Sequence, residues 1–261
     1  MQKTYIWPKI TRISHILLIV TLFLAYVISD EKSVLNFHVA LGTSLGILFL
    51  FRVIWGFIGP KYSKFSDFTF DINELKDYTL NVFGKKKEYL GHNPASSWAI
   101  IAMIVLAFIS VITGFLAYGI QDNKGIFASF GTPFLKSTGI FGDIHSFFVN
   151  LLVFVVFVHI AGVIMDKVFH KGDALTSMID GYKKGKEKNI KLNIIQKVFS
   201  VVWIFFPIFF IVYILSVPNN IFIKKANLKS SYTKKISKLV NIREKKVLSK
   251  DFISLKRRFR E

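Results

Sequence analysis

The chain has 261 residues, of which 52% are hydrophobic and 16% aromatic, and it contains no cysteine. A mean hydropathy of +0.46 excludes an ordinary soluble domain, and the lack of thiols excludes disulfides, iron–sulfur clusters and thioether-linked haem. The formal charge is +19, but the basic residues flank apolar segments. Membrane topology and anionic lipid therefore explain the charge better than nucleic acid does.

Apolar segments that are long enough to cross about 30 Å of hydrocarbon recur along the chain. There are five, at about 13–29, 34–58, 97–120, 144–166 and 197–217. The first is too long and too polar at its start for a removable signal peptide, so we expect it to be retained. The sequence thus predicts an all-α integral membrane protein, with a four-helix bundle in 1–185, an additional apolar helix and fifth span in 186–217, and a basic tail in 218–261.

The first two spans each begin at a histidine, His15 and His38. Gly42 and Gly46 follow His38 on nearly the same helix face, where they leave room either for a flat ligand or for close packing of another helix. Arg52 shares the face of His38, fourteen residues further along. Its guanidinium can bind an anionic group inside the protein or extend to the membrane interface.

The loop 59–96 is a connector between the second and third spans, and it ends in the motif G-H-N-P. Asn93 and Pro94 are typical of a helix start. His92 is then either a polar residue at a helix entrance or a contact for a proton-coupled ligand such as a quinone, because imidazole can relay protons near neutral pH.

The fourth span carries His145 and His159, fourteen residues apart. In an α-helix fourteen residues come within about 40° of four full turns and cover about 21 Å along the axis. Both imidazoles therefore lie on the same side of the helix at two depths in the membrane. Each needs its own partner.

The distribution of Lys and Arg favours a cytoplasmic N-terminus. With that orientation the cytoplasmic segments that flank the first four spans carry 17 Lys and Arg, and the external segments carry three. If 197–217 crosses the membrane, the tail adds fourteen Lys and Arg to the outside, and the two counts become equal. The segment 197–217 is therefore a fifth span or else re-entrant or peripheral. Within the tail an apolar stripe predicts an amphipathic helix that lies on the membrane or docks on a partner; it comprises Leu248, Phe252, Leu255 and Phe259.

Four of the six histidines lie in or at the edge of apolar spans, where an unpaired imidazole costs several kcal/mol. Because successive spans alternate in direction, His15 and His159 share one depth, and His38 and His145 share the other. Two cross-helix histidine pairs stacked across the membrane are what two bis-histidine haems require. The alternative is a metal-ion or proton transporter, although transporter sites gather near the midplane and these spans contain almost no carboxylates.

Several motifs resemble one known family when they are taken in order along the chain. They are W-P-K-I-T-R-I-S-H at 7–15, F-H-V-A-L-G at 37–42, R-V-I-W-G-F-I-G-P-K-Y-S-K-F at 52–65, G-H-N-P at 91–94, and H-x13-H-I-A-G-V from His145 to Val163. Over roughly 5–185 the chain is similar to prokaryotic di-haem cytochromes b, which include the b-type cytochrome subunits of nickel–iron hydrogenases and stand-alone bacterial relatives.

The resemblance implies two non-covalent haem b groups held at His15, His38, His145 and His159. It also implies a multi-pass protein of the bacterial inner membrane that carries electrons between a periplasmic redox protein, hydrogenase-like or a cytochrome c, and the quinone pool. Such a chain is an electron-transfer subunit of a quinone-linked oxidoreductase such as a hydrogenase complex, with lipid, quinone and a second copy of the chain as further partners. A haem propionate is then the anion expected at Arg52, and a quinone contact is expected at His92.

Overall fold

The computed structural model describes residues 2–29, 31–81 and 89–225. The chain divides into two units, 1–224 and 225–261. The amphipathic stripe predicted for 248–259 lies outside the described residues.

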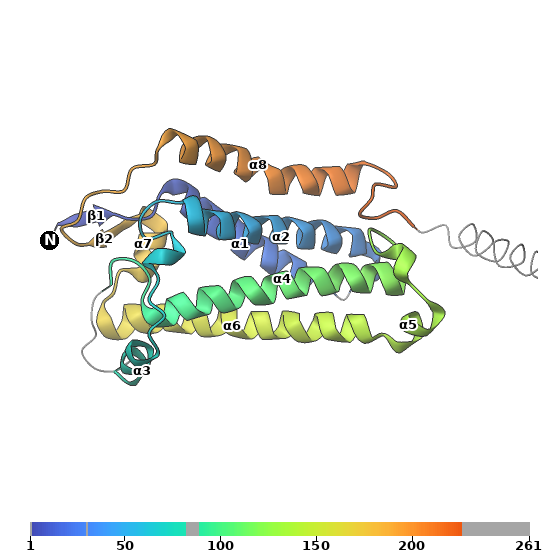
Figure 1. Ribbon diagram of the computed structural model, residues 1–261, viewed down its shortest axis with the longest axis horizontal. Coiled ribbons are helices and arrows are strands. Elements are labelled where there is room, and N and C mark those ends of the chain that lie inside the picture. Colours follow the sequence, from blue (N-terminus) through green and yellow to red (C-terminus); the bar gives the residue numbers. More distant parts are fainter. Residues whose placement is uncertain (1, 30, 82–88, 226–261) are drawn as a thin grey trace, which may run out of the picture. The chain divides into compact units, whose positions relative to one another are not determined.

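Five long apolar helices make up most of the described part of the first unit, and Figure 1 shows their arrangement. Each is long and apolar enough to cross a membrane, and their lengths range from 19 to 31 residues. The all-α membrane fold is therefore confirmed. The helices are α1 (Lys9–Val27), α2 (Leu35–Ile58), α4 (Pro94–Asp122), α6 (Ile140–His170) and α8 (Ile194–Ser216).

Short elements connect the long helices. A 3-10 turn, η1 (Lys32–Val34), joins α1 to α2. The other short elements are η2 (Phe65–Asp67), α3 (Ile72–Leu80), η3 (Ala128–Phe130), α5 (Pro133–Thr138) and α7 (Ala174–Asp180). Strands β1 (Lys3–Tyr5) and β2 (Tyr182–Lys184) pair antiparallel, with Lys3 opposite Lys184. This pairing ties the start of α1 to the segment that follows α6.

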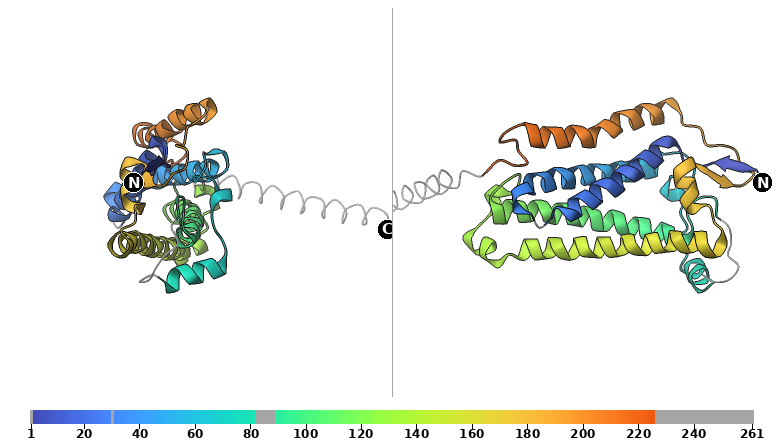
Figure 2. Two further views of the ribbon diagram at one scale, coloured as in Figure 1. Left: turned by 90° about the vertical axis from the view of Figure 1, so that its left-hand side faces the viewer. Right: turned by 180° about the vertical axis from the view of Figure 1, so that it is seen from behind.

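The long helices pack as neighbours, with α6 along α4, α2 between α1 and α4, and α8 on the outer side of α2 (Figures 1 and 2). The central contact is made by Leu45 and Phe49 of α2, Ile104 and Ala107 of α4, and Leu152 of α6. Many other large apolar side chains of these helices are exposed, above all in α1, α6 and α8. An apolar exterior of this kind suits contact with lipid.

Helices α4 and α6 extend a few residues beyond both ends of the predicted apolar runs, and α8 begins before its run, because polar caps lie outside the hydrocarbon segment. Asn93 caps α4, where its side chain accepts a hydrogen bond from the Ser96 N–H at 2.7 Å, and Pro94 occupies the first turn, as predicted. Asn193 and Gln196 form a capping box at the start of α8. Hydropathy marks the part of a helix that suits lipid, whereas the hydrogen-bonded helix continues to its caps.

Helix α8 is continuous and antiparallel to α2 over most of its length. The Gln196 side chain donates to the Ile58 carbonyl at 2.8 Å, and the Trp203 indole donates to the Ile47 carbonyl at 3.2 Å. Further along, the Ser44 hydroxyl donates to the carbonyl of Pro207 at 2.9 Å. These contacts at one end and in the middle of α2 place α8 alongside α2, and α8 is long and apolar enough to be a fifth span.

Candidate functional site

Two of the predicted histidines come together at one end of the bundle. His38 lies in the first turn of α2 and His145 in the second turn of α6. Their ring centres are 6.1 Å apart, and the ring planes are nearly perpendicular, at 84°. Both residues are partly buried. The pairing expected from helix direction and depth is thus the one that the fold brings into contact.

The second nitrogen of each ring is fixed by a backbone carbonyl. His38 Nδ1 lies 2.9 Å from the Ala25 oxygen, and His145 Nδ1 lies 2.9 Å from the Ser110 oxygen. A carbonyl oxygen can only accept, so the hydrogen sits on Nδ1 in both rings and Nε2 keeps its lone pair. Metal-binding histidines typically donate their other ring N–H in this way.

The carbonyl of Ala25 is available because it lies in the last turn of α1, where carbonyls lack helical partners. Ser29 N–H, which would otherwise reach it, donates to Tyr26 instead. The end of α1 therefore orients a side chain of α2.

Glycines provide space around this pair. A Cβ placed on Gly114 of α4 would lie 2.9 Å from His145 Cε1, so the imidazole occupies the space that a side chain would need. A Cβ on Gly42 would meet nothing within 4 Å, whereas a Cβ on Gly46 would lie 3.2 Å from the Val111 side chain. Gly42 thus borders open space, and Gly46 serves close helix packing.

The other two predicted histidines, His15 of α1 and His159 of α6, lie at the opposite end of the bundle. The two imidazoles are close enough to interact electrostatically. Both are partly buried, and neither makes a hydrogen bond to another residue that the structure describes. A Cβ on Gly162, three residues after His159, would meet nothing within 4 Å. Gly162 therefore borders open space, and the ring nitrogens of His15 and His159 have no hydrogen-bond partner among the described residues.

Arg52 lies at the same end as His15 and His159, as its position in α2 predicts. Its Nη1 donates to the Ser63 carbonyl at 3.2 Å, and its guanidinium carbon lies 5.2 Å from the Phe65 ring centre and 5.5 Å from that of Phe68. The guanidinium is therefore held by the segment after α2. Most of its N–H groups remain free to donate.

His92 packs between aromatic rings directly before α4. Its ring centre lies 5.0 Å from that of Trp7 and 4.6 Å from that of Phe68. Burial lowers the pKa of His92 well below its usual value, and the positive charges of Arg52 and Lys183 add to this effect. His92 is therefore a neutral imidazole at neutral pH, next to the guanidinium of Arg52.

Lys183 of β2 holds the loop that leads to His92. Its ammonium donates to the carbonyls of Tyr89 at 3.2 Å and Gly91 at 3.1 Å. Burial lowers the pKa of Lys183, and the carboxylates of Asp166 and Asp173 oppose this effect. The two-stranded sheet thereby connects the start of the chain to the position of His92.

Several residues around the histidines carry no recognisable sequence signal. The carbonyls of Ala25 and Ser110 act through the backbone, which any residue supplies. Gly114 is one small residue among many in an apolar helix. Lys183 stands among other lysines after α6. A search for histidines alone finds the rings and misses the groups that orient them.

Comparison with known proteins identifies the family. The family model of prokaryotic cytochrome b561 matches residues 6–181, which include all four histidines of the two pairs. The chain belongs to this family. It is therefore a multi-pass membrane cytochrome of the b type, and the group that the family implies is haem b. The resemblance noted from the motifs is confirmed.

Curated relatives of this cytochrome include subunits of hydrogenase complexes. The probable Ni/Fe-hydrogenase 1 B-type cytochrome subunit of Escherichia coli K12 is 25% identical over 165 residues, which are 57% of this chain and 69% of that protein. The corresponding subunit of Rhizobium leguminosarum is 28% identical over 166 residues, which are 58% of this chain and 69% of that protein. No solved structure shows significant similarity to the chain.

Proposed function

We propose that this cytochrome conducts electrons across the bacterial inner membrane through two haem b groups, each bound between two histidines. His38 and His145 hold the outer haem, and His15 and His159 hold the inner one. The end of the bundle with His38 and His145 would face a periplasmic redox protein, and the end with His15 and His159 would face the quinone pool. The hydrogenase subunits among the relatives support a hydrogenase-like partner.

The geometry of His38 and His145 carries the proposal. A metal–imidazole bond is about 2 Å long, so two imidazoles on opposite sides of one iron place their ring centres about 6 Å apart. The observed separation is 6.1 Å. Both Nδ1–H groups are occupied by carbonyls, so both Nε2 atoms are left to bind. The residues present therefore fit a bis-histidine haem.

The inner pair supports the second haem by its chemistry. Neither His15 nor His159 has a hydrogen bond to a described residue, although a polar group without a partner in hydrocarbon costs several kcal/mol. Each imidazole would gain a partner by binding an iron, and Gly162, three residues after His159, borders open space. Arg52, with free N–H groups at this end, would bind a propionate.

When bound, a haem with two imidazole ligands supplies reversible one-electron transfer without an open coordination site. The chain does the rest. The Nδ1–H bonds keep the ring orientation of His38 and His145 fixed, which limits reorganisation. The apolar spans exclude water. His92 is a neutral imidazole near the inner pair, and its ring would form a hydrogen bond with a quinone or a propionate.

The charge distribution supports the orientation. With the N-terminus cytoplasmic, the segments at the His15 end carry 17 Lys and Arg, against three at the His38 end up to the start of α8. The alternative function, a metal-ion or proton transporter, lacks this kind of support. Within the described ranges no group of three or more His, Asp or Glu side chains could hold a metal ion.

The experiment is haem analysis of the purified chain followed by transfer assays in sealed vesicles. We expect two low-spin b haems per chain in the reduced-minus-oxidised spectrum. We also expect reduction of an impermeant acceptor on one side by quinol supplied with the membrane. One haem per chain, or no transfer across an intact membrane, would refute the proposal.

A further inference from the structure

A cavity of about 540 Å³ lies at the His15 end of the bundle, away from the histidines. One wall is the segment 59–64, which follows α2, and the other is the segment 187–196, which leads into α8. No residue of the two histidine pairs lines it. The volume is in the range of ligand-binding pockets.

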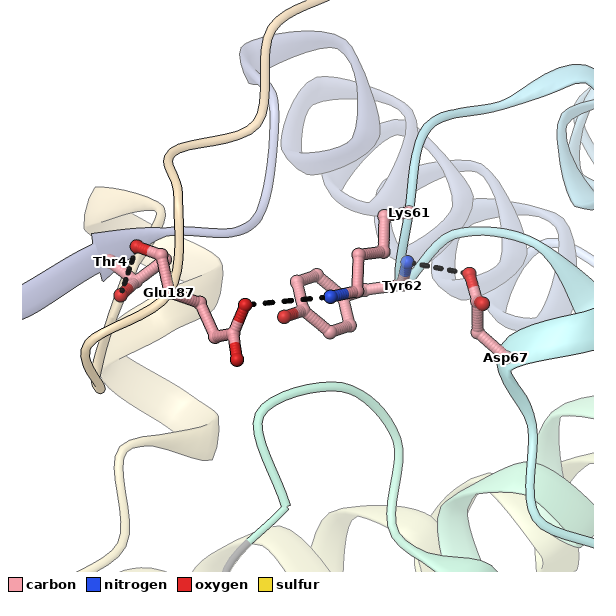
Figure 3. Close-up of polar contacts among 5 residues, drawn as sticks. All are labelled: Thr4, Lys61, Tyr62, Asp67 and Glu187. Carbon is pink, nitrogen blue, oxygen red and sulfur yellow. Dashed lines mark hydrogen bonds and ion pairs between the residues drawn. The ribbon is translucent and has the colours of Figure 1, made fainter.

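The cavity is strongly basic. Its lining contains the four lysines Lys61, Lys64, Lys188 and Lys191, and one acidic residue, Glu187. Lys61 pairs with Glu187 across the cavity, with 3.6 Å between nitrogen and oxygen (Figure 3). The other three lysines have no ion pair with any residue that the structure describes. The lining therefore presents three uncompensated positive charges.

Hydrogen bonds fix both walls. The Thr4 hydroxyl donates to the Glu187 carbonyl at 3.1 Å, and the Tyr62 N–H donates to an Asp67 carboxylate oxygen at 2.8 Å (Figure 3). On the second wall, Ile190 N–H donates to the Tyr5 carbonyl at 2.9 Å. The lysines thus project from a framework that is already built, which reduces the entropic cost of binding.

The position of the cavity distinguishes a lipid from a soluble anion. It lies where α2 ends at Ile58 and α8 begins at Ile194, at the boundary of the apolar segments. Directly next to it, Phe57 is 69% exposed and Ile194 and Ile195 are each 71% exposed. A basic pocket between helices that continues into exposed apolar surface matches a phosphate headgroup with its acyl chains.

We propose that this cavity binds the headgroup of an anionic phospholipid from the leaflet on the N-terminal side, with its acyl chains along the exposed faces of α2 and α8. Lys64, Lys188 and Lys191 contact the phosphate. Because the two walls belong to the ends of α2 and α8, the bound lipid stabilises the docking of α8 on α2. The inference does not depend on the number of haems or on the electron route.

The test measures thermal stabilisation of the full chain in zwitterionic detergent on addition of phosphatidylglycerol, phosphatidylcholine or inorganic phosphate. The variant K64Q/K188Q/K191Q removes the three free charges. The control K9Q/K167Q/K171Q removes three exposed lysines from the same end of the bundle. We expect the first variant to bind phosphatidylglycerol at least ~10-fold more weakly, and the control to bind it like the wild type.

A second variant keeps the test decisive if the triple variant is poorly folded. E187Q releases Lys61 from its ion pair, so phosphatidylglycerol should bind more tightly than to the wild type. Equal loss of binding in both triple variants, or equal stabilisation by phosphatidylcholine, would overturn the proposal. Stabilisation by inorganic phosphate alone, at the same concentration as the lipid, would identify a site for soluble anions and overturn the lipid assignment.

Discussion

The imidazole of His145 occupies the space above Gly114, 2.9 Å from the position that a Cβ on that glycine would take. The contact joins α4 to α6 at the pair of His38 and His145, and the same ring donates to the Ser110 carbonyl one turn earlier in α4. Helix α4 carries no haem-ligand candidate of its own, yet it positions one. The consequences for haem binding can be tested directly.

Substitution of Gly114 should weaken the outer haem. Gly114→Ala forces the His145 ring to move by a few tenths of an ångström, and Gly114→Val requires a larger shift. Overpacking of this kind typically costs 1–3 kcal/mol, so we expect roughly ten- to hundredfold weaker retention of the outer haem in the valine variant. The haem content of the protein after gel filtration measures how much of the outer haem is retained. Gly162→Ala is the control, because it lies at the opposite end and should leave the outer haem unchanged.

Arg52 should raise the midpoint potential of the inner haem. Removing its positive charge in Arg52→Gln favours the oxidised, more positive haem, so that potential should fall by ~60 mV, which corresponds to about 1.4 kcal/mol for one electron. Arg52→Lys keeps the positive charge and should therefore lower the potential less than Arg52→Gln does. Redox titration resolves the two haems, and the outer potential serves as the internal reference. A shift confined to the outer haem would show that Arg52 acts elsewhere.

His92 should make the protein less stable in acid. Its folded pKa lies well below the unfolded value, so the unfolded state binds more protons as pH falls below about 6.5. The contribution of His92 to the free energy of unfolding is fully present above that pH, and it is lost as the pH falls toward the folded pKa. The melting temperature of His92→Asn should therefore fall less between pH 7.5 and pH 5 than that of the wild type. Equal declines would show that His92 is protonated in the folded protein.

The absence of native cysteine allows a clean test of orientation and of the fifth span. Single variants Lys136→Cys, Lys186→Cys and Lys224→Cys place one thiol at each exposed site. An impermeant maleimide added to intact cells with a permeable outer membrane should label 136 and 224, which lie at the His38 end, and spare 186. Labelling of 186 and 224 together would exclude α8 as a spanning helix.

Sequence reasoning locates the spans and the histidine pairs because both follow from strong constraints. Hydrocarbon requires long apolar helices, and alternating helix direction assigns His38 to His145 without any knowledge of packing. Helix ends are less well predicted, because α6 continues to His170 beyond its apolar run. The partners of Arg52 could not be predicted, since they depend on how the loop that contains Ser63 and Phe68 folds back. The role of Gly114 could not be predicted either, because it depends on how closely the His145 ring packs against α4.

The most direct test of the two-pair assignment is haem analysis of single alanine variants of His15, His38, His145 and His159. In membranes that retain the chain, His38→Ala and His145→Ala should lose the same spectral component and leave the other. His15→Ala and His159→Ala should lose the second component and leave the first. If His38→Ala and His159→Ala instead remove the same haem, or if a single variant leaves both haems in place, the pairing is wrong.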